Sequence, residues 1–395
     1  MKRIILFIGG VETLGFFSLQ MEKTFRRLGH ETFIFDYDRE AQSAFDLLNF
    51  IKKGSCVMLT FNFHGICNEE LLRDSNNTYI WEELRVPCYN IVVDHPFYYD
   101  RFMEQLPPDY TQISIDQNHE AYLERFYPHI KRGPFLPLAG TDFDWEGEML
   151  PIKDRPIDVV FTGSWAEPEF WGQYMSSEGP EYEEFYRRVL KEQLDNPDLT
   201  FEEVFEPAIR REAEEGDDIS DDMLRQAYAH MIYFDMYVRY YFRGEVVRHI
   251  AQAGIRVVCV GGGWDHMSFP GCENIECVPY VDSAECLRFI RKAKISINVM
   301  PWFKRGSHDR IFNSMLNGAA CLTDSSLYLE KILEDGKNCR IFDLKRLYEL
   351  PGIIREMLSD EGTLQRMADE GRLLALAGHT WEKRAMSLSS YFENA

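Results

Sequence analysis

Apolar runs of strand length recur along the chain between stretches with helical periodicity. In the first part of the chain these runs are RIILFI (3–8), ETFIFDYD (31–38), CVMLTFN (56–62), YNIVVD (89–94) and TQISID (111–116). Strands that alternate with helices predict a parallel sheet covered by helices, and ligands bind at the carboxyl ends of such strands. The pattern therefore predicts an α/β domain over residues 1–150.

A second block of alternating strands and helices follows a Pro-containing segment near residues 151–156, which we interpret as a linker. Its predicted strands are IDVVFTGSW (157–165), IRVVCVGGGW (255–264), NIECVPYV (274–281), ISINVM (295–300) and ACLTD (320–324). A helical insert is expected at about residues 181–253, acidic at first and then aromatic. At 395 residues the chain is too long for one ordinary core. We therefore predict two Rossmann-like domains, 1–150 and 151–378, followed by a final segment, 379–395.

The stretch 308–324 predicts a short amphipathic helix that runs into a buried strand. Its packed face has four apolar residues at helical spacing: Phe312, Met315, Leu316 and Ala319. A second stripe is polar and is expected to leave an edge free for a ligand: Arg310, Asn313 and Asn317. Gly318 suits the left-handed residue that ends a helix.

Positive charge gathers at the start of this helix, in Lys304, Arg305, His308 and Arg310. A helix N-terminus carries unpaired N–H groups and about half a positive charge, so the segment is typical of an anion site, with phosphate expected. The alternative is a solvated positive patch. The formal charge of the chain is −22, which argues against nucleic acid and anionic membranes as partners. An anionic ligand therefore needs a local basic cluster of this kind.

The composition also indicates whether a metal site is expected and in which cellular compartment the protein is found. The nine cysteines include no CxxC motif and no histidine at ligand spacing, so we expect no zinc site. The first residues lack a signal-peptide pattern, and no run of about 18 apolar residues could span a membrane. These features predict a cytoplasmic protein without stable membrane insertion.

The predicted helix and strand also resemble a family pattern. In spore-maturation-type glycosyltransferases, of the glycosyl transferase group 1 type, the C-terminal domain carries R-x-F-E-x-x-x-x-G before a strand that ends in Thr-Asp. The corresponding residues are Arg310, Phe312, Asn313, Gly318, Thr323 and Asp324. Many relatives have a glutamate that holds the ribose hydroxyls where this chain has Asn313, which keeps hydrogen-bonding groups but lacks the charge.

Other segments extend the resemblance over most of the chain. FNFHG (61–65) and VVDHP (92–96) are similar to the N-terminal domain of this group, and FTGSW (161–165) to the opening of its donor domain. GHTWEKRA (378–385) resembles the segment where the last helix crosses back to the first domain. The resemblance implies the GT-B architecture, in which two Rossmann-like domains face each other across a cleft.

The same resemblance implies an activity. A sugar would pass from a nucleotide-diphosphate sugar, with a UDP-sugar favoured, to a hydroxyl of a glycan, a protein or a small molecule. Neither a metal nor another cofactor is expected to be obligatory. Hexosyl transfer and N-acetylhexosaminyl transfer both remain open.

Turns after two strands complete the predicted donor site. Gly163 and Ser164 would present backbone N–H groups to a phosphate, although an ordinary strand-to-helix turn is the alternative. Gly261 and Gly262 would let a flat base approach closely, with Tyr280 at its edge, unless they serve tight turn geometry. The other predicted donor-binding residues are Lys304, Arg305, His308, Arg310 and Asn313.

Catalytic groups are expected from the first domain. Asp94 and His95 end a strand before Pro96, and either could take a proton from the acceptor hydroxyl. His64 ends another strand in the same way. The alternative for a lone histidine at a strand end is a structural role.

Asp36 with Asp38, and Asp142 with Asp144, match the Asp-x-Asp metal motif of the other major glycosyltransferase fold. Such pairs arise easily by chance in an acidic chain, so no metal site is predicted from them.

Two alternative functions remain. Asp36 would hold a ribose in an NAD-dependent oxidoreductase, but Gly9, Gly10 and Gly15 do not form G-x-G-x-x-G. A non-catalytic nucleotide-sugar-binding protein or partner subunit is the other alternative, because Asn313 replaces the usual glutamate.

Overall fold

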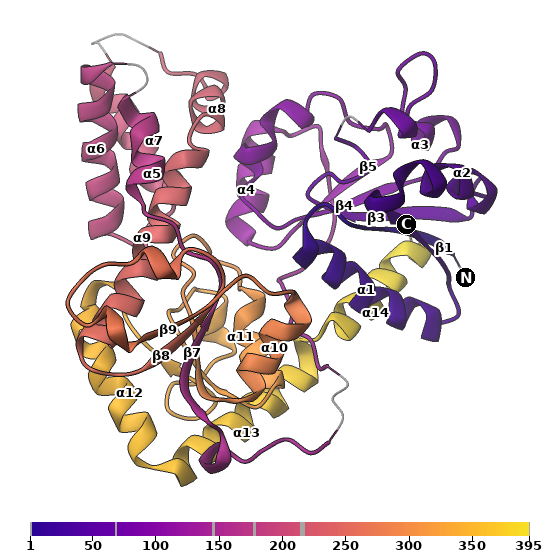
Figure 1. Cartoon of the computed structure of the whole chain (residues 1–395). Helices are drawn as coiled ribbons and strands as arrows, with labels where there is room; N and C mark the ends of the chain where they lie inside the picture. Colours follow the sequence, from indigo (N-terminus) through magenta and orange to yellow (C-terminus); the bar gives the residue numbers. More distant parts are fainter. Residues whose placement is uncertain (1, 68, 144–146, 177–178, 214–217, 395) are drawn as a thin grey trace. The chain divides into compact units, whose positions relative to one another are not determined.

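The chain folds into two compact units. The computed structural model describes residues 2–67, 69–143, 147–176, 179–213 and 218–394. Unit 1 comprises Met1–Thr141 with His379–Ala395, and unit 2 comprises Asp142–Gly378 (Figure 1). Each unit has its own six-stranded sheet, and the strand pairs are parallel. The predicted α/β class with two Rossmann-like domains is confirmed, and the division falls at Thr141, before the Pro-containing segment.

The sheet of unit 1 has the strand order β2-β1-β3-β4-β5-β6. Its strands are β1 (Arg3–Ile8), β2 (Glu31–Asp36), β3 (Cys56–Phe61), β4 (Cys88–Val92), β5 (Tyr110–Ser114) and β6 (Lys131–Arg132). Three of the four interior strands, β3, β4 and β5, are buried along their whole length. Continuous apolar strands of this kind are expected where helices cover both faces of a sheet.

The C-terminal helix completes the core of unit 1. The helices of this unit are α1 (Glu12–Arg27), α2 (Glu40–Phe50), α3 (Ile80–Glu83), α4 (Gln117–Phe126) and α14 (Trp381–Asn394). Figure 1 shows the yellow α14 beside the indigo α1, and the two helices are in contact. The Trp381 and Phe17 rings lie 4.4 Å apart, and those of Phe392 and Tyr89 lie 4.7 Å apart. The last segment of the chain therefore packs with the first domain.

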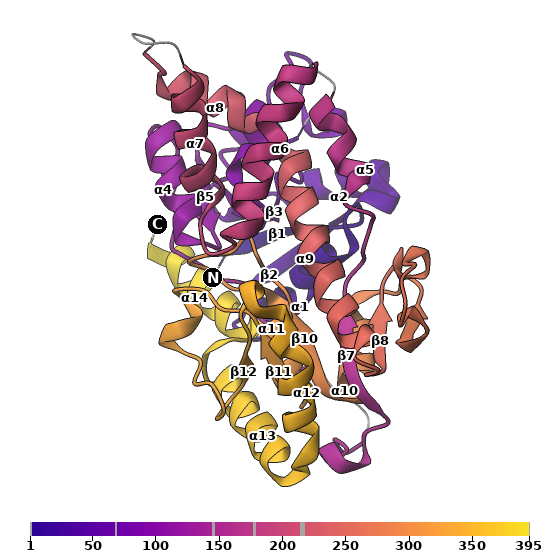
Figure 2. The same ribbon diagram turned by 90° about the vertical axis from the view of Figure 1, so that its left-hand side faces the viewer.

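The sheet of unit 2 has the strand order β12-β11-β10-β7-β8-β9. Its strands are β7 (Ile157–Thr162), β8 (Val257–Val260), β9 (Ile275–Val278), β10 (Ala293–Asn298), β11 (Ala320–Thr323) and β12 (Arg340–Ile341). The helices that accompany them are α5 (Glu169–Gly172), α10 (Ser283–Arg291), α11 (Asp309–Leu316), α12 (Leu350–Ser359) and α13 (Glu361–Gly378). Helix α13 packs against both α11 and α12, as Figure 2 shows.

A helical insert separates β7 from β8. Its helices are α6 (Pro180–Asp195), α7 (Phe201–Glu212), α8 (Asp221–Ala229) and α9 (Ile232–Gln252). Thr200 and Glu203 form a capping box that starts α7. Part of the aromatic run forms the core of the insert, where the Phe201 ring lies 4.8 Å from Phe205 and 5.3 Å from Phe234. Helix α9 then leads back to the sheet.

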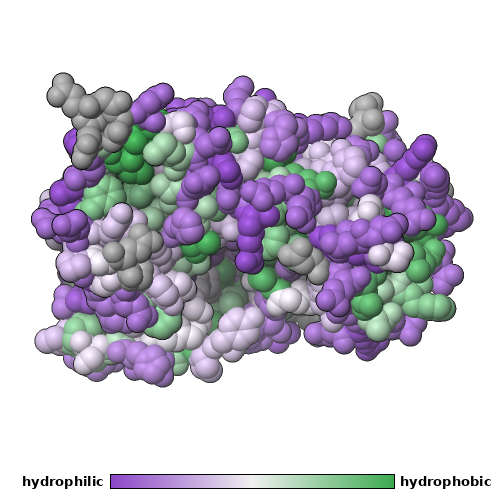
Figure 3. Space-filling view, turned by 90° about the horizontal axis from the view of Figure 1, so that it is seen from above, coloured by the Kyte–Doolittle hydropathy of each residue, from purple (hydrophilic) through white to green (hydrophobic). Residues whose placement is uncertain are grey.

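The face of the molecule drawn in Figure 3 is mainly polar. Figure 3 shows one face on which hydrophilic residues predominate and hydrophobic residues form scattered patches. None of the helices in the described ranges combines the length and the apolar character needed to cross a membrane.

Candidate functional site

The sheet of unit 2 has a topological switch point between β7 and β10. From β7 the chain continues to β8 and β9 on one side, and from β10 to β11 and β12 on the other. Ligands of open parallel sheets bind at the carboxyl ends of the strands where the order reverses. Here these ends lead into the Gly163–Ser164 turn and the Val299–Met300 segment, so the site is expected beside them.

Arg310 reaches this switch point from the first turn of α11. Its guanidinium donates from Nε to Asn298 Oδ1 (3.1 Å) and from Nη2 to the Val299 carbonyl (3.0 Å). The third nitrogen, Nη1, lies toward Gly163, where a Cβ atom would be 3.4 Å from it. The side chain is buried, and this burial is the main cause that lowers the pKa of Arg310 to about 10.

A second buried arginine, Arg243, meets the same turn from α9. Its Nη1 donates to the Ser164 carbonyl (2.9 Å), and the residue is 7% exposed. Its Nε is buried and has no hydrogen-bond partner among the described residues. Burial, followed by the charges of Arg310 and Arg239, lowers the pKa of Arg243 well below its ordinary value.

The two guanidiniums have no carboxylate partner among the described residues. Within the described part of the chain, neither Arg243 nor Arg310 forms an ion pair. Arg239, one turn before Arg243, pairs with Asp235 (3.1 Å). The Trp302 ring lies 4.4 Å from the Arg239 guanidinium and 5.5 Å from that of Arg243. Because buried and unpaired charge is costly, this cluster is suited to receive an anion.

Arg239 and Arg243 are absent from the sequence prediction because they lie in the insert, far along the chain from the Gly163–Ser164 turn that Arg243 contacts. One signal could have found them. They stand four residues apart in the aromatic run YVRYYFR (237–243), and this spacing places two cations on one face of a helix.

Packing explains two of the glycines that follow β8. Gly261 has a φ of +146°, and a Cβ atom there would lie 2.6 Å from the Gly163 carbonyl. Gly263 has a φ of +90°, and a Cβ atom there would lie 1.9 Å from the Trp165 carbonyl oxygen. Gly262 has open space instead, and its N–H donates to Ser164 Oγ (3.2 Å). Of these three glycines, Gly262 leaves the most room for a ligand.

The Gly163–Ser164 turn uses most of its backbone donors internally. The Gly163 N–H donates to the Val260 carbonyl (2.8 Å), and the Trp165 N–H donates to the Gly262 carbonyl (2.9 Å). The Ser164 N–H is then the donor of this turn that a phosphate could use.

Helix α11 begins and ends where the sequence predicts. His308 precedes it, and Gly318 follows it with a φ of +76°. The expectation of a free polar edge is wrong, because α11 is buried along its length and packs against α13. Asn313 Nδ2 donates to Asp309 Oδ2 (2.9 Å), and Asn317 Nδ2 donates to the Asn313 carbonyl (2.9 Å).

His308 adds no positive charge to the site at neutral pH. Burial, and then the charge of Arg310, lowers the pKa of His308 to about 4. Its Nδ1 lies 2.6 Å from Asp309 Oδ1, and the Arg310 N–H points to the same nitrogen from 3.3 Å. Burial raises the pKa of Asp309, but His308 and Arg310 outweigh it and hold that pKa below its ordinary value. Of His308 and Asp309, the charged residue is therefore Asp309, whose carboxylate links His308 to Asn313.

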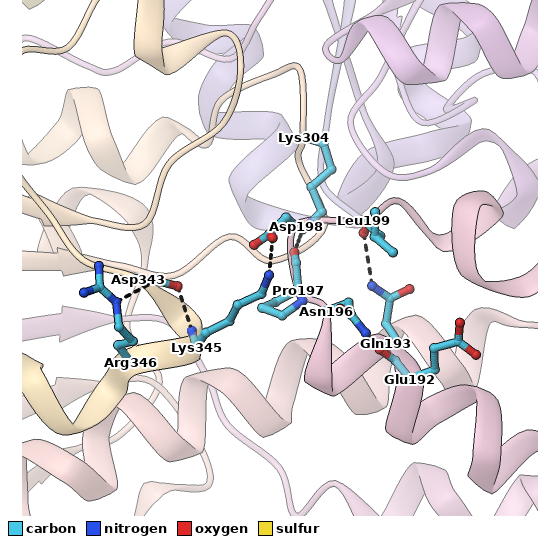
Figure 4. A network of polar contacts seen from close by, with 10 residues as sticks. All are labelled: Glu192, Gln193, Asn196, Pro197, Asp198, Leu199, Lys304, Asp343, Lys345 and Arg346. Carbon is cyan, nitrogen blue, oxygen red and sulfur yellow. Dashed lines mark hydrogen bonds and ion pairs between the residues drawn. The ribbon is translucent and has the colours of Figure 1, made fainter.

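Lys304 is tied to the insert, as Figure 4 shows. Its ammonium donates to the carbonyls of Pro197 and Pro301. Next to it, Lys345 forms an ion pair with Asp198, and Gln193 Nε2 donates to the Leu199 carbonyl (3.1 Å). Together these contacts hold the segment between α6 and α7 in place. The two carbonyls that accept from Lys304 would compete with a phosphate for its ammonium group.

Two further residues of the predicted donor set are surface residues. Arg305 is exposed, and Tyr280 is 65% exposed in the segment after β9.

In unit 1, Asp94 follows β4 and is held in place from two sides. Asn62 Nδ2 donates to Asp94 Oδ2 (3.0 Å), while Asn62 Oδ1 accepts from the Val93 N–H (2.9 Å). The Tyr99 hydroxyl also donates to Asp94 Oδ2 (3.1 Å). Both contacts fix the position of the carboxylate.

His95 is packed among rings. Its ring centroid lies 4.3 Å from that of Phe97, 4.8 Å from that of His119 and 4.9 Å from that of Tyr122. One ring nitrogen also accepts from the Phe97 N–H (3.3 Å), at the start of the 3-10 helix Pro96–Phe102. These contacts fit a structural role for His95.

His64 lies at the switch point of the unit 1 sheet, between β1 and β3. A Cβ atom on Gly10, which follows β1, would be 3.4 Å from the His64 ring. Burial lowers the pKa of His64, and the ring forms no hydrogen bond with any described residue. The two residues before it, Asn62 and Phe63, have φ values of 46° and 66°. Left-handed backbone is strained for such residues and is frequent at functional sites.

The Asp-x-Asp pairs form local contacts. Asp36 Oδ1 accepts from the Asp38 N–H (3.0 Å), and Asp142 pairs with Arg372 (3.1 Å); Asp144 lies outside the described residues. In the ranges that the structure describes, no group of three or more His, Cys, Asp or Glu residues is placed to hold a metal ion.

The fold is that of GT-B glycosyltransferases. A sucrose-phosphate synthase from Thermosynechococcus elongatus is 12% identical, with a TM-score of 0.54 and coverage of 100% of this chain and 99% of that one. An alpha-glucosyltransferase in complex with UDP is 11% identical, with a TM-score of 0.57 and full coverage of both chains. HepE from Anabaena, in complex with UDP and glucose, is 10% identical, with a TM-score of 0.51 and full coverage of both chains.

A family model described as "Glycosyl transferase-like" matches residues 243–390, a range that begins at Arg243 and contains α11. No curated protein matches the sequence. The predicted enzyme class, glycosyltransferase, is confirmed by this domain, and the fold is the one that the resemblance implies.

Proposed function

We propose that the protein transfers a sugar from a nucleotide-diphosphate sugar, held by unit 2, to an acceptor hydroxyl, and that its subgroup is the spore-maturation type. The observation that carries this proposal is the pair of buried guanidiniums, Arg243 and Arg310, at the switch point of unit 2 without a carboxylate partner. A UDP-sugar is favoured as the donor, because UDP is bound in the alpha-glucosyltransferase and HepE structures named above.

Departure of the nucleoside diphosphate concentrates negative charge on the leaving oxygen. Preorganised cations in a site shielded from water stabilise such charge. Arg243 and Arg310 are fixed by hydrogen bonds to Ser164, Asn298 and Val299, so little reorganisation is needed when the charge develops. Two guanidiniums can supply the charge that a divalent cation supplies in other enzymes, which supports a reaction without an obligatory metal.

The nucleoside is assigned to the neighbouring groups. Gly262 leaves room for the base, and Tyr280 is exposed two residues after β9, the strand that pairs with β8. Asn313 is held by Asp309, so the pair presents an amide and a carboxylate where relatives use one glutamate. The ribose hydroxyls would bind to this pair.

Unit 1 is proposed to supply the acid/base group. Asp94 is the first choice because two donors hold its carboxylate, and His95 then orients the segment. His64 is the second choice, because it lies at a switch point as a neutral imidazole without hydrogen bonds to described residues.

A donor screen tests the proposal. The melting temperature of the purified full chain would be measured with UDP-, GDP- and dTDP-sugars. The release of free nucleotide would be measured with the same donors. A donor at a hundredfold excess over its Kd stabilises the folded state by about 2.7 kcal/mol. We expect stabilisation by a UDP-sugar, its loss in Arg243→Met, and activity that persists with a chelator.

Three outcomes separate the alternatives. Binding with neither hydrolysis nor transfer would favour the nucleotide-sugar-binding protein over the enzyme. Stabilisation by NAD alone would favour the oxidoreductase. No stabilisation by any donor would contradict the proposed site.

A further inference from the structure

Six aromatic side chains form a continuous row over the insert and the segment before it in unit 2. The row runs through α5, the 3-10 helix Gln173–Ser176, α9 and α6. Successive ring centroids are 5.3, 6.3, 6.2, 6.1 and 6.5 Å apart. In order along this aromatic row, the residues are Phe170, Trp171, Tyr174, Tyr233, Tyr186 and Tyr182.

The aromatic row is at the surface. Phe170 is 54% exposed, Tyr174 46% and Tyr182 53%, and the other three rings are partly exposed. Large aromatic rings in a protein core are mostly buried, as Phe205 and Phe234 are in the same insert. Contiguous exposed rings of this kind mark binding surfaces.

The aromatic row leads to the anion site. The Trp171 ring stacks on that of Tyr240 (6.3 Å, 11° between planes), and the Arg243 guanidinium lies 5.7 Å from the Tyr240 ring. Tyr233 of the aromatic row and Arg243 both lie on α9, where they are separated by about 15 Å at 1.5 Å per residue. A ligand on the aromatic row could therefore extend toward a donor held at Arg243.

Charge restricts the class of ligand. Arg187, at the edge of the aromatic row, is neutralised by Glu169 (3.1 Å) and Glu183 (3.5 Å). The Tyr237 hydroxyl also donates to Glu169 (2.9 Å). Paired charges and carboxylates can bind hydroxyl groups, but this edge offers no excess positive charge to an anionic polymer.

We propose that the aromatic row binds a neutral oligosaccharide acceptor, with the apolar faces of sugar rings stacked on its exposed aromatic rings. The planes of Phe170 and Trp171, and those of Tyr233 and Tyr186, are nearly perpendicular (89° and 85°), so the row offers separate stacking faces and not one flat platform. This inference rests on the proposed sugar-transfer function and specifies its acceptor. Tyrosine and tryptophan suit the task because one edge of the ring is polar and its face is apolar.

Direct binding tests the inference. Maltohexaose, cellohexaose and chitohexaose would each be titrated into the full chain by calorimetry, with ligand-detected NMR for weak binding. We expect at least one to bind, and the double variant Tyr174→Ala/Tyr182→Ala to weaken binding by about tenfold or more. Tyr348→Ala is the matched control, because Tyr348 is 70% exposed in unit 2 outside the aromatic row.

The outcomes distinguish this inference from the proposed function. UDP binding should be unchanged in the double variant, so a loss of hexasaccharide binding alone supports the aromatic row. The absence of binding by all three hexasaccharides, equal binding by the double variant, or equally tight binding of oligo-dT would overturn the inference. If wild type binds a hexasaccharide but no nucleotide, the proposed donor site fails while the aromatic row stands.

Discussion

Arg243 donates from Nη1 to the backbone carbonyl of Ser164 across 2.9 Å, and so joins the helical insert to the turn after β7. This hydrogen bond holds a buried cation in place without neutralising it. Burial and the repulsion from Arg310 and Arg239 both disfavour its charge in the free protein. The arrangement is explained if an anion completes it.

Arg243→Met should change stability and binding in opposite ways. Replacing an unpaired buried cation with an apolar side chain of similar length relieves desolvation and repulsion, so the free energy of unfolding should stay equal or rise. Affinity for a UDP-sugar should fall by about 1.5–3 kcal/mol, the range for a hydrogen bond to a charged group. Denaturant unfolding without ligand measures the first effect, and calorimetry the second.

Arg155→Met is the matched control for this prediction. Arg155 is equally buried, but it donates to the carbonyls of Leu150, Ala293 and Asn317. Its replacement should lower the free energy of unfolding by about 1–3 kcal/mol, because buried acceptors lose their donor. Equal destabilisation by both substitutions would contradict the anion role of Arg243.

Gly261→Ala should disturb the donor site, whereas Gly262→Ala should be tolerated. A Cβ atom on Gly261 would approach Gly163 to 2.6 Å in a backbone conformation that L side chains rarely adopt, but one on Gly262 meets open space. We expect Gly261→Ala to cost about 1–3 kcal/mol of unfolding free energy. Thermal unfolding of both variants checks this, and similar melting temperatures would count against the packing of the two turns.

The sequence predicts the strands well because those of parallel sheets are short apolar runs between helices. Helix α11 is also correctly predicted, since Gly318 supplies the left-handed residue that ends it. The neutral state of His308 is not predicted from the sequence, because it depends on the burial of the ring and on the charge of Arg310. The contribution of Arg243 depends on how the insert folds back onto β7, and no local pattern encodes that contact.

Asp94 and His95 should respond differently to substitution. If Asp94 is the base, Asp94→Asn should lower kcat by about 10²–10⁴-fold, with little change in donor affinity. His95→Ala should mainly lower the melting temperature, because its ring packs against Phe97, His119 and Tyr122. Turnover and thermal unfolding would be measured on the same preparations.

His64 is the alternative to Asp94 as the acid/base group. Near-wild-type turnover in Asp94→Asn, together with a large loss in His64→Gln, would transfer the role to His64. The pH profile would then report an imidazole whose pKa is below its ordinary value.

Asp324 should make stability fall as the pH rises. Burial raises the pKa of this carboxyl from 3.8 to about 7, although Lys304 and the Met300 N–H oppose the shift. A folded-state pKa above the unfolded value means that the stabilisation is complete below 3.8 and is lost as the pH rises through about 7. Wild type should therefore lose stability relative to Asp324→Asn between about pH 4 and pH 7.

His308 and His379 have the opposite effect on the pH dependence of the free energy of unfolding. Burial lowers the pKa of each to about 4, so their stabilisation is lost as the pH falls below 6.5. Wild type and Asp324→Asn both carry these histidines, so the difference between their stability curves against pH isolates the effect of Asp324. Parallel curves for wild type and Asp324→Asn would rule out its titration in this range.

The central claim is that Arg243 holds a nucleotide diphosphate. The most direct test compares the dissociation constants of uridine and UDP. Calorimetry would give the ratio of the two constants in wild type and in Arg243→Met. Because uridine lacks the phosphates, the ratio isolates their contribution to binding. The account predicts a large ratio in wild type that falls by about tenfold or more in the variant, while uridine affinity is unchanged. An equal ratio in both proteins would contradict the claim.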